Sequence, residues 1–168
     1  MKNHFELFGL APAFALDAAA LELAYRDIQS RIHPDRFAQA GEAERRASVQ
    51  WTAQVNEAYR VLKSPVQRAK YLLEMSGVDV GFETNTQMPS EFLLRQLELR
   101  ESLAEAKDAA ALDRLLDDVL AQTRDLEREV GDLIDTRRDL PAATGAVRKL
   151  MFLNRLADEV DDAHEALG

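Results

Sequence analysis

The sequence predicts an all-α protein made of two small helical domains. Apolar residues recur at three- and four-residue spacing through most of its 168 residues, which is the period of a helix buried on one face. Only 7 glycines and 5 prolines are present, so few positions interrupt helices. We expect residues 1–76 to form a helical hairpin with short flanking helices, residues 77–88 a linker, and residues 89–168 a three-helix bundle.

The first domain is expected to contain an antiparallel helical hairpin. Asp17 is a suitable N-cap, and the helix after it ends at Pro34, because proline lacks an amide hydrogen and disfavours helical geometry at the residue before it. A second helix is predicted from about Glu42 to Leu62. The facing apolar stripes comprise Leu21, Ala24, Tyr25, Ile28 and Ile32 on the first helix, and Ala47, Trp51, Val55, Ala58, Tyr59 and Leu62 on the second.

The triplet His33-Pro34-Asp35 falls in the turn between these two helices, so we expect it to be an exposed site. It continues a polar surface with basic character, to which the first helix adds Arg26, Gln29 and Ser30. A metal site or an acid–base pair built on His33 and Asp35 is disfavoured, because no motif places a further ligand beside them.

The second domain follows a segment without helical period, which begins at Gly77, the expected C-cap of the preceding helix. Its three helices are predicted at Pro89-Ser90 to Ala106, Ala109 to Thr136, and Pro141 to Leu167. Gly131 marks a point where the middle helix can kink. The core positions of that helix are Leu112, Leu115, Leu116, Val119, Leu126, Val130 and Leu133.

Helical geometry divides the first bundle helix into a core stripe and a second apolar arc. The core stripe comprises Phe92, Leu99, Leu103 and Ala106. The second arc carries Leu93, Leu97 and Ala104, and beside it lie Leu94, Glu98, Glu101 and Glu105. An apolar patch bordered by carboxylates is therefore expected on the surface, where a partner would cover it.

On the third bundle helix, one face carries the predicted core residues Ala146, Val147, Leu150, Leu153, Ala157 and Val160. Phe152 points nearly opposite, beside Arg148, Arg155 and Leu156, so we expect it to be exposed with the apolar patch. The alternative is wider packing, within the bundle or against the first domain, which would make Leu93, Leu97 and Phe152 ordinary core residues.

Residues 1–76 resemble a J-domain, the module through which co-chaperones drive the ATPase of a DnaK-type chaperone. The resemblance rests on His33-Pro34-Asp35, Asn56-Glu57-Ala58-Tyr59, Leu62, Ser64-Pro65, Arg68-Ala69 and Tyr71. Leu72 follows this tyrosine where general J-proteins usually have aspartate, and no Gly/Phe-rich or cysteine-rich segment comes after it. Two later runs, Gln96-Leu97-Glu98-Leu99-Arg100-Glu101 and Val147-Arg148-Lys149-Leu150-Met151-Phe152-Leu153, resemble the HscB family of iron–sulfur co-chaperones.

This resemblance implies a co-chaperone, and not an enzyme, that activates an HscA-like, DnaK-type ATPase. The implied docking residues are His33, Pro34, Asp35, Arg26, Arg31 and Arg36. Asp35 would accept charge-assisted hydrogen bonds from an arginine of the chaperone, and Arg26 and Arg31 would meet acidic residues. Asp27 weakens this basic face, since many J-domains carry lysine or arginine there.

The same resemblance implies that the bundle binds an IscU-like iron–sulfur scaffold. The residues it assigns to that contact are Leu93, Leu94, Leu97, Glu98, Glu101, Glu105 and Phe152. The rival interpretations are a general protein-folding J-protein and a helical adaptor that keeps the triplet without stimulating an ATPase.

Composition limits the remaining possibilities. The chain has no cysteine, so it cannot hold an iron–sulfur cluster through thiolates, and we expect no metal or cofactor of its own. Residues 1–76 carry a net charge of +1 and residues 77–168 one of −10, which argues against a nucleic-acid surface. No segment has the roughly 18 apolar residues of a membrane span, and the first residues lack a signal-peptide core, so we expect a cytoplasmic protein.

Overall fold

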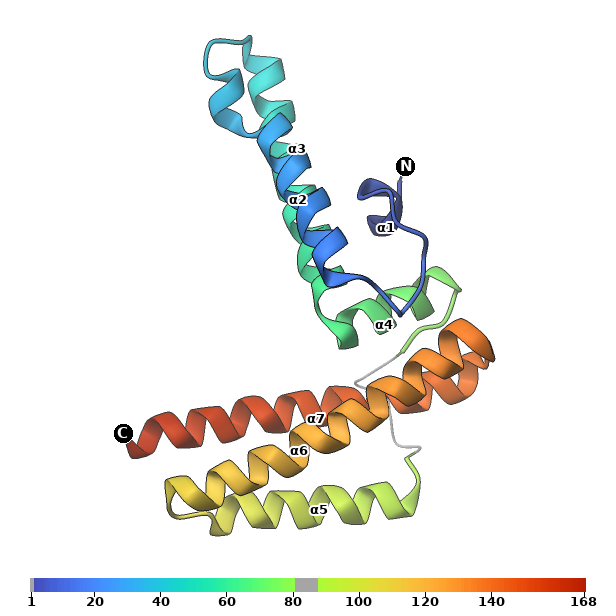
Figure 1. The fold of residues 1–168 in the computed structure, drawn as a ribbon, viewed down its shortest axis with the longest axis vertical. Helices are drawn as coiled ribbons and strands as arrows, with labels where there is room; N and C mark the ends of the chain where they lie inside the picture. The colour runs from blue at the N-terminus through green and yellow to red at the C-terminus, as the bar shows by residue number, and fades with distance from the viewer. Residues whose placement is uncertain (1, 81–87) are drawn as a thin grey trace. The chain divides into compact units, whose positions relative to one another are not determined.

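The computed structural model describes residues 2–80 and 88–168, and within these ranges it is helical with no strand (Figure 1). The all-α prediction is confirmed. The chain divides into two compact units, Met1–Leu72 and Leu73–Gly168, and the division falls inside a helix. The middle of the predicted linker, residues 81–87, lies outside the described residues.

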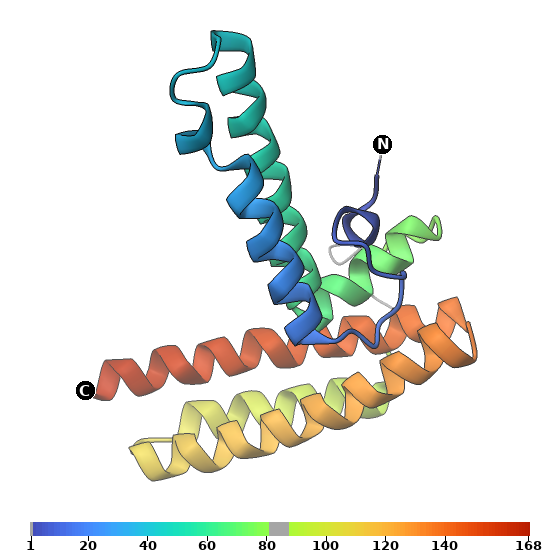
Figure 2. The same cartoon turned by 45° about the horizontal axis from the view of Figure 1, so that its top comes forward.

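The first unit contains the predicted hairpin. Helices α2 (Ala18–Ile32) and α3 (Glu42–Lys63) run antiparallel, joined through a short 3-10 helix, η1 (Pro34–Phe37), as Figures 1 and 2 show. The Asp17 carboxylate caps α2 by accepting hydrogen bonds from the amides of Ala19 and Ala20 at 3.0 and 3.2 Å. The Tyr25 ring stacks on Tyr59, with 3.9 Å between centroids, so the hairpin is closed midway by an aromatic contact.

The hairpin is flanked by the short helix α1 (His4–Leu7) and by α4 (Pro65–Met75). A buried arginine, Arg68, joins three segments: its Nε donates to the carbonyl of Phe14 and its Nη1 to that of Leu62, both at 2.7 Å. These two hydrogen bonds offset part of the cost of burying the guanidinium group. The buried apolar residues of the unit include Phe5, Phe8, Phe14, Leu21, Val55, Ala58, Leu62, Val66 and Ala69.

Two predicted core positions of the hairpin are wrong. Ala47 is exposed, and the Trp51 side chain is 47% exposed. Trp51 lies on the same stripe of α3 as Val55, one helical turn closer to the loop between α2 and α3. Its large indole is only partly covered there, whereas the small Ser48 one turn before it is buried.

The second unit is a bundle of three long helices, α5 (Ser90–Glu105), α6 (Ala109–Gly131) and α7 (Leu140–Leu167). The predicted boundaries hold to within one residue except at the end of α6, where Asp132–Thr136 form a π-helical turn directly after Gly131. Gly77 closes α4 with a φ of +86°, a conformation that suits glycine, so its predicted role as C-cap is confirmed. No helix in the described ranges is long and apolar enough to cross a membrane.

Helices α6 and α7 form a long antiparallel pair, and the shorter α5 packs on only part of its length (Figure 2). The core under α5 combines residues of all three helices, namely Leu99, Leu112, Leu115, Val119, Phe152, Leu153, Leu156 and Val160. Because α5 lies across both other helices there, the middle of α7 is covered on two sides. This arrangement determines what the surface of the bundle presents.

Candidate functional site

The triplet of the first unit is held by its own backbone. His33 caps η1, since its carbonyl accepts from the Arg36 amide at 2.9 Å and its Nδ1 accepts from the Asp35 amide at 3.2 Å. Pro34 begins the turn with a pre-set φ and needs no hydrogen-bond acceptor. The Asp35 side chain is 93% exposed, so its carboxylate is presented to solvent from a fixed turn.

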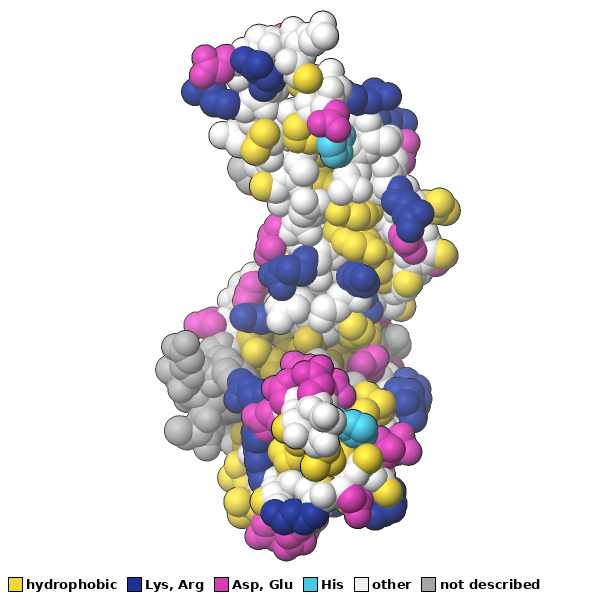
Figure 3. Space-filling model, turned by 90° about the vertical axis from the view of Figure 1, so that its left-hand side faces the viewer, with side chains coloured by type: hydrophobic (Ala, Val, Ile, Leu, Met, Phe, Trp, Pro, Cys, Tyr) yellow, Lys and Arg dark blue, Asp and Glu magenta, His cyan; other side chains and the backbone are white. Residues whose placement is uncertain are grey.

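The basic side chains near this turn are partly neutralised within the helix. Arg26 bonds Glu22 at 2.7 Å, and Arg31 bonds Asp27 at 3.2 Å, one helical turn apart in each case. All four side chains are about half exposed or more, and such surface pairs contribute at most about 1 kcal/mol, so a partner can displace them. Figure 3 shows Lys/Arg and Asp/Glu side chains interspersed on the upper part of the visible face, without a continuous basic stripe.

On the bundle, the structure places three leucines of α5 at the surface. Leu93 is 44% exposed, and Leu94 and Leu97 are 60% exposed each. Glu98, Glu101 and Glu105 are exposed on the same helix, and Glu98 accepts a bond from Arg95 at 3.1 Å. The predicted apolar arc bordered by carboxylates is therefore present on the surface of α5.

The prediction that Phe152 is exposed is wrong. Its side chain is only 8% exposed and belongs to the bundle core, where its ring meets Phe92 edge-on with 5.7 Å between centroids. Leu156, predicted beside it, is completely buried. The reason is that α5 packs on α7 as well as on α6, so the buried arc of α7 is wider than one apolar stripe. The alternative of wider packing within the bundle is therefore correct for Phe152, whereas Leu93 and Leu97 remain exposed at the surface.

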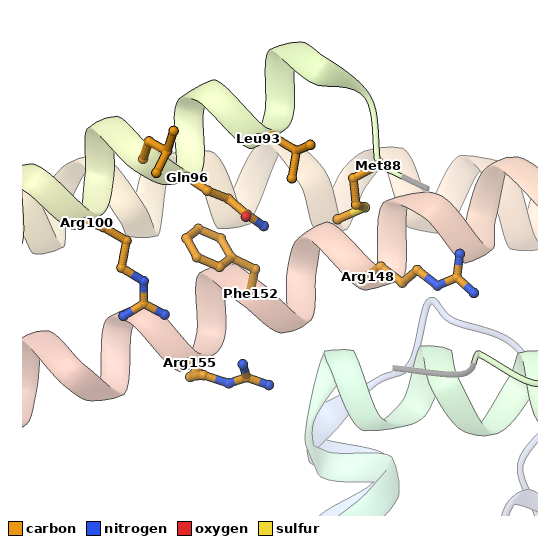
Figure 4. A pocket seen from close by; sticks show the side chains of 8 residues that line it. Met88, Leu93, Gln96, Arg100, Arg148, Phe152 and Arg155 are labelled. Carbon is orange, nitrogen blue, oxygen red and sulfur yellow. The ribbon is translucent and has the colours of Figure 1, made fainter. Parts of the chain in front are cut away.

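Phe152 nevertheless lines a pocket of about 330 Å³ between α5 and α7 (Figure 4). The α5 side of this pocket is formed by Leu93, Gln96, Leu97 and Arg100, with Met88 just before the helix. Helix α7 contributes Phe152 together with Arg148 and Arg155. Two of the exposed leucines and the buried phenylalanine thus meet in one concave site, where Phe152 forms a rigid wall.

The sequence prediction noted Arg148 and Arg155 beside Phe152 but did not assign them to this site, and it omitted Met88, Gln96 and Arg100. Part of the signal was present, because Gln96 lies three residues after Leu93 and Arg100 three residues after Leu97, spacings that place side chains on neighbouring positions of one helix face. The partner wall on α7 depends on how the two helices pack, which the spacing within one helix does not reveal.

In the described ranges, no group of three or more His, Cys, Asp and Glu side chains is placed to hold a metal ion. The arrangements at both surfaces instead have the features of protein contacts. The surface of the first unit presents the Asp35 carboxylate on a short turn, near arginines whose ion pairs a partner can displace. The surface of the bundle combines apolar side chains with charges of both signs.

Comparison with known proteins gives concordant results. Residues 88–161 match a family model described as the HSCB C-terminal oligomerisation domain. The chain is 49% identical to the co-chaperone protein HscB homolog of Burkholderia multivorans, over 98% of this chain and 95% of the relative. It is 45% identical to the homolog of Azoarcus sp., over 99% and 96% respectively.

Solved structures agree with these relatives over nearly the whole chain. The chaperone HscB from Vibrio cholerae matches with a TM-score of 0.86 and 37% identity, covering 99% of this chain and 100% of that one. Human co-chaperone protein HscB matches with a TM-score of 0.93 and 27% identity, covering 96% of this chain and 82% of that one. The similarity therefore includes both units.

Proposed function

Since the chain belongs to the HscB family of co-chaperones, we propose that it stimulates the ATPase of an HscA-like, DnaK-type chaperone and delivers an IscU-like iron–sulfur scaffold to it. The observation that supports this proposal is the presence of two exposed surfaces of different chemistry, one on each unit. One is the rigid turn with the Asp35 carboxylate, and the other is the leucine surface of α5.

At the first surface, Asp35 accepts charge-assisted hydrogen bonds from an arginine of the chaperone. Because the backbone of Asp35 is held in a short 3-10 turn, this segment loses little backbone freedom when it binds, which favours a specific contact. Arg26, Arg31 and Arg36 meet acidic residues of the chaperone, with Arg26 and Arg31 exchanging their partners Glu22 and Asp27. Hydrolysis itself is performed by the chaperone, and this chain acts as its regulator.

At the second surface, the scaffold covers Leu93, Leu94 and Leu97 of α5. These leucines supply apolar area that is exposed in the free protein, and Phe152 supports them as a fixed wall of the adjoining pocket. Glu98, Glu101 and Glu105 border the contact and attract basic side chains of the scaffold, acting chiefly on the rate of association. Bringing the scaffold and the ATPase into one assembly couples delivery to hydrolysis.

The proposal is tested by single-turnover ATP hydrolysis with a purified HscA-like chaperone. We expect stimulation by this chain alone, and a larger stimulation when the scaffold is added with it. An unfolded polypeptide that replaces the scaffold equally well would instead indicate a general protein-folding J-protein. No stimulation under any condition would indicate a helical adaptor.

A further inference from the structure

The beginning of α3 carries an exposed site that belongs to neither of the surfaces described above. Glu42, Arg45, Arg46, Val49 and Gln50 line an open cavity of about 400 Å³. All five residues belong to α3, so among the described residues the wall of this cavity comes from one helix. A partner can supply the other wall.

This site lies on the same edge and at the same end of the hairpin as the triplet. The edge is identified by the Tyr25 hydroxyl, which donates to Asn56 of α3 at 2.7 Å and accepts from Gln29 of α2 at 3.0 Å. Val49 precedes Asn56 by seven residues, close to two full helical turns, so both side chains leave α3 on one side. His33 follows Gln29 by one turn. Because α2 and α3 are antiparallel, the end of α2 and the beginning of α3 lie at the same end of the hairpin, where η1 packs on α3.

The arginines of this site can exchange water for a partner at little cost. Arg45 is exposed, and no carboxylate in the described ranges forms an ion pair with its guanidinium group. Arg46 lies 3.9 Å from Glu42, and these two side chains are 72% and 76% exposed. A pair this long and this exposed contributes little to stability, so an acidic group of a partner can replace Glu42.

Val49 adds an apolar group to the same site. Its side chain is 56% exposed. A single exposed valine is ordinary on a protein surface, but this one lies one helical turn after both Arg45 and Arg46. A segment that neutralises the arginines would therefore also cover the valine. The site fits a segment that carries acidic residues beside an apolar one, and it disfavours a basic segment, because like charges would meet.

We propose that the beginning of α3 is a further contact for the ATPase chaperone, in which Arg45 and Arg46 bind an acidic segment of the chaperone and Val49 contacts an apolar side chain of that segment. The inference rests on the proposed function and extends its first surface from α2 and the triplet onto α3. The planar guanidinium groups can each hold a carboxylate with two parallel hydrogen bonds. This contact strengthens binding, whereas the triplet triggers hydrolysis.

The test measures single-turnover ATP hydrolysis by the purified chaperone against the concentration of this chain, without scaffold. Two variants probe the site: Arg45→Gln with Arg46→Gln, and Val49→Ala. The charge control is Arg114→Gln with Arg124→Gln, which removes two exposed arginines of α6. The apolar control is Leu23→Ala, because Leu23 is 71% exposed on α2 but lies on a different side of that helix from Gln29.

We expect the concentration for half-maximal stimulation to rise about fivefold for the double arginine variant and about threefold for Val49→Ala. Maximal stimulation should stay close to that of the wild type, since the triplet is intact. Both controls should remain within about twofold of the wild type. Higher ionic strength should reduce the difference made by the arginines. Melting curves check the fold, and Val49→Ala, whose substituent favours a helix, serves if the double arginine variant is destabilised.

The chemistry of the bound segment is tested on the chaperone. Its exposed Asp and Glu residues are changed to amides one at a time, and stimulation is measured with the wild type and with the double arginine variant. We expect at least one change that weakens the wild type but adds little to the double arginine variant, the signature of a direct pair. If no acidic residue shows this coupling, the arginines do not bind an acidic segment and the inference is wrong.

The outcomes separate this inference from the proposed function. If both site variants stimulate like the wild type, or if the charge control weakens as much as the double arginine variant, the inference fails and the proposed function stands. A loss of maximal stimulation at an unchanged half-maximal concentration would also contradict it, because it would assign these residues to triggering. Weaker scaffold binding by the site variants would assign the surface to the scaffold instead. If the wild type does not stimulate the chaperone, the proposed function fails, and the inference fails with it.

Discussion

At the scale of single residues, the same kind of apolar side chain has opposite roles in this bundle. Leu97 is 60% exposed and available to a partner, while Phe152 is 8% exposed and supports the fold. Both were expected on one outward patch. Their effects on stability and binding can therefore be separated by substitution, although they line the same pocket.

Truncating the exposed leucines should affect binding and not folding. For Leu93→Ala with Leu97→Ala, we expect scaffold affinity to fall by well over tenfold, since interface anchors commonly contribute about 1 to 3 kcal/mol each. Melting should change little, and basal ATPase stimulation should persist because the triplet lies in the other unit. Calorimetry and thermal melting measure both effects, with Leu120→Ala, an exposed leucine of α6, as control. An unchanged affinity would place the scaffold contact elsewhere.

Truncating Phe152 should affect folding first. Phe152→Ala removes a buried ring from contact with Phe92 and leaves a cavity, which typically costs about 3 to 5 kcal/mol. We expect a clear decrease in the denaturant midpoint of the second unit, followed by helical circular dichroism. A midpoint equal to that of the wild type would contradict the buried position of the ring.

Substitutions in the triplet His33-Pro34-Asp35 should affect ATPase stimulation and not stability, the opposite of Phe152→Ala. His33→Gln or Asp35→Asn is expected to abolish ATPase stimulation, while helicity and melting remain nearly unchanged because both side chains are exposed in a turn. The matched control is His164→Gln, which alters another exposed histidine that pairs with an aspartate, Asp113. Loss of helicity in parallel with stimulation would show that the triplet acts through the fold.

His4 provides a pH-dependent contribution to stability. Burial lowers the pKa of its imidazole below the ordinary value of 6.5, and the nearby Glu57 opposes this only partly. As the pH falls below 6.5, the unfolded chain takes up a proton at this position more readily than the folded one, so the free energy of unfolding decreases. The His4 ring stacks on Tyr71 with 4.2 Å between the ring centroids, and His4→Phe keeps an aromatic ring in that place. This variant should flatten the pH dependence of the free energy of unfolding between about pH 7 and 5. An identical slope in wild type and variant would exclude this contribution.

At the scale of helices, α5 presents a different kind of side chain on each of three faces. One face packs into the core through Leu99, another exposes the leucines, and a third carries the glutamates. Because α5 covers only part of the α6–α7 pair, it both buries Phe152 and leaves a pocket at its own edge. The candidate site is therefore a consequence of where this helix packs.

The glutamate face of α5 should control the rate of binding. Changing Glu98, Glu101 and Glu105 together to Gln is expected to lower the association rate with the scaffold several-fold at low salt, with a smaller effect on dissociation. Added salt should reduce the difference, because screening weakens interactions between exposed charges. Stopped-flow binding at two ionic strengths measures this effect. Changing Asp117, Asp125 and Glu129 on α6 to their amides is the control with equal charge, and an equal rate decrease there would indicate only a net-charge effect.

At the scale of the whole molecule, charge and surface type are divided between the two units. Residues 1–76 are nearly neutral with a net charge of +1, and residues 77–168 carry −10. The first unit presents a turn with an exposed carboxylate, and the second an apolar surface in an acidic setting. The proposed function assigns one partner to each of these two surfaces.

The sequence by itself determined the features that depend on neighbouring residues. The N-cap at Asp17, the helix end before Pro34, the C-cap at Gly77 and the outward arc of Leu93 and Leu97 all follow from local hydrogen bonding and helical spacing. The resemblance of its motifs also indicated the HscB family, which the relatives confirm.

Only the tertiary structure decided how much of each helix is covered. Trp51 shares a stripe with core residues yet is half exposed. Phe152 and Leu156 lie off the predicted stripe of α7 yet are buried, because they join the core that α5, α6 and α7 share. The pocket that joins Leu93 to Arg148 and Arg155 likewise requires two helices far apart in the chain. Helical spacing assigns each side chain a direction, but burial depends on which other helices lie in that direction, and that is a property of the packed molecule.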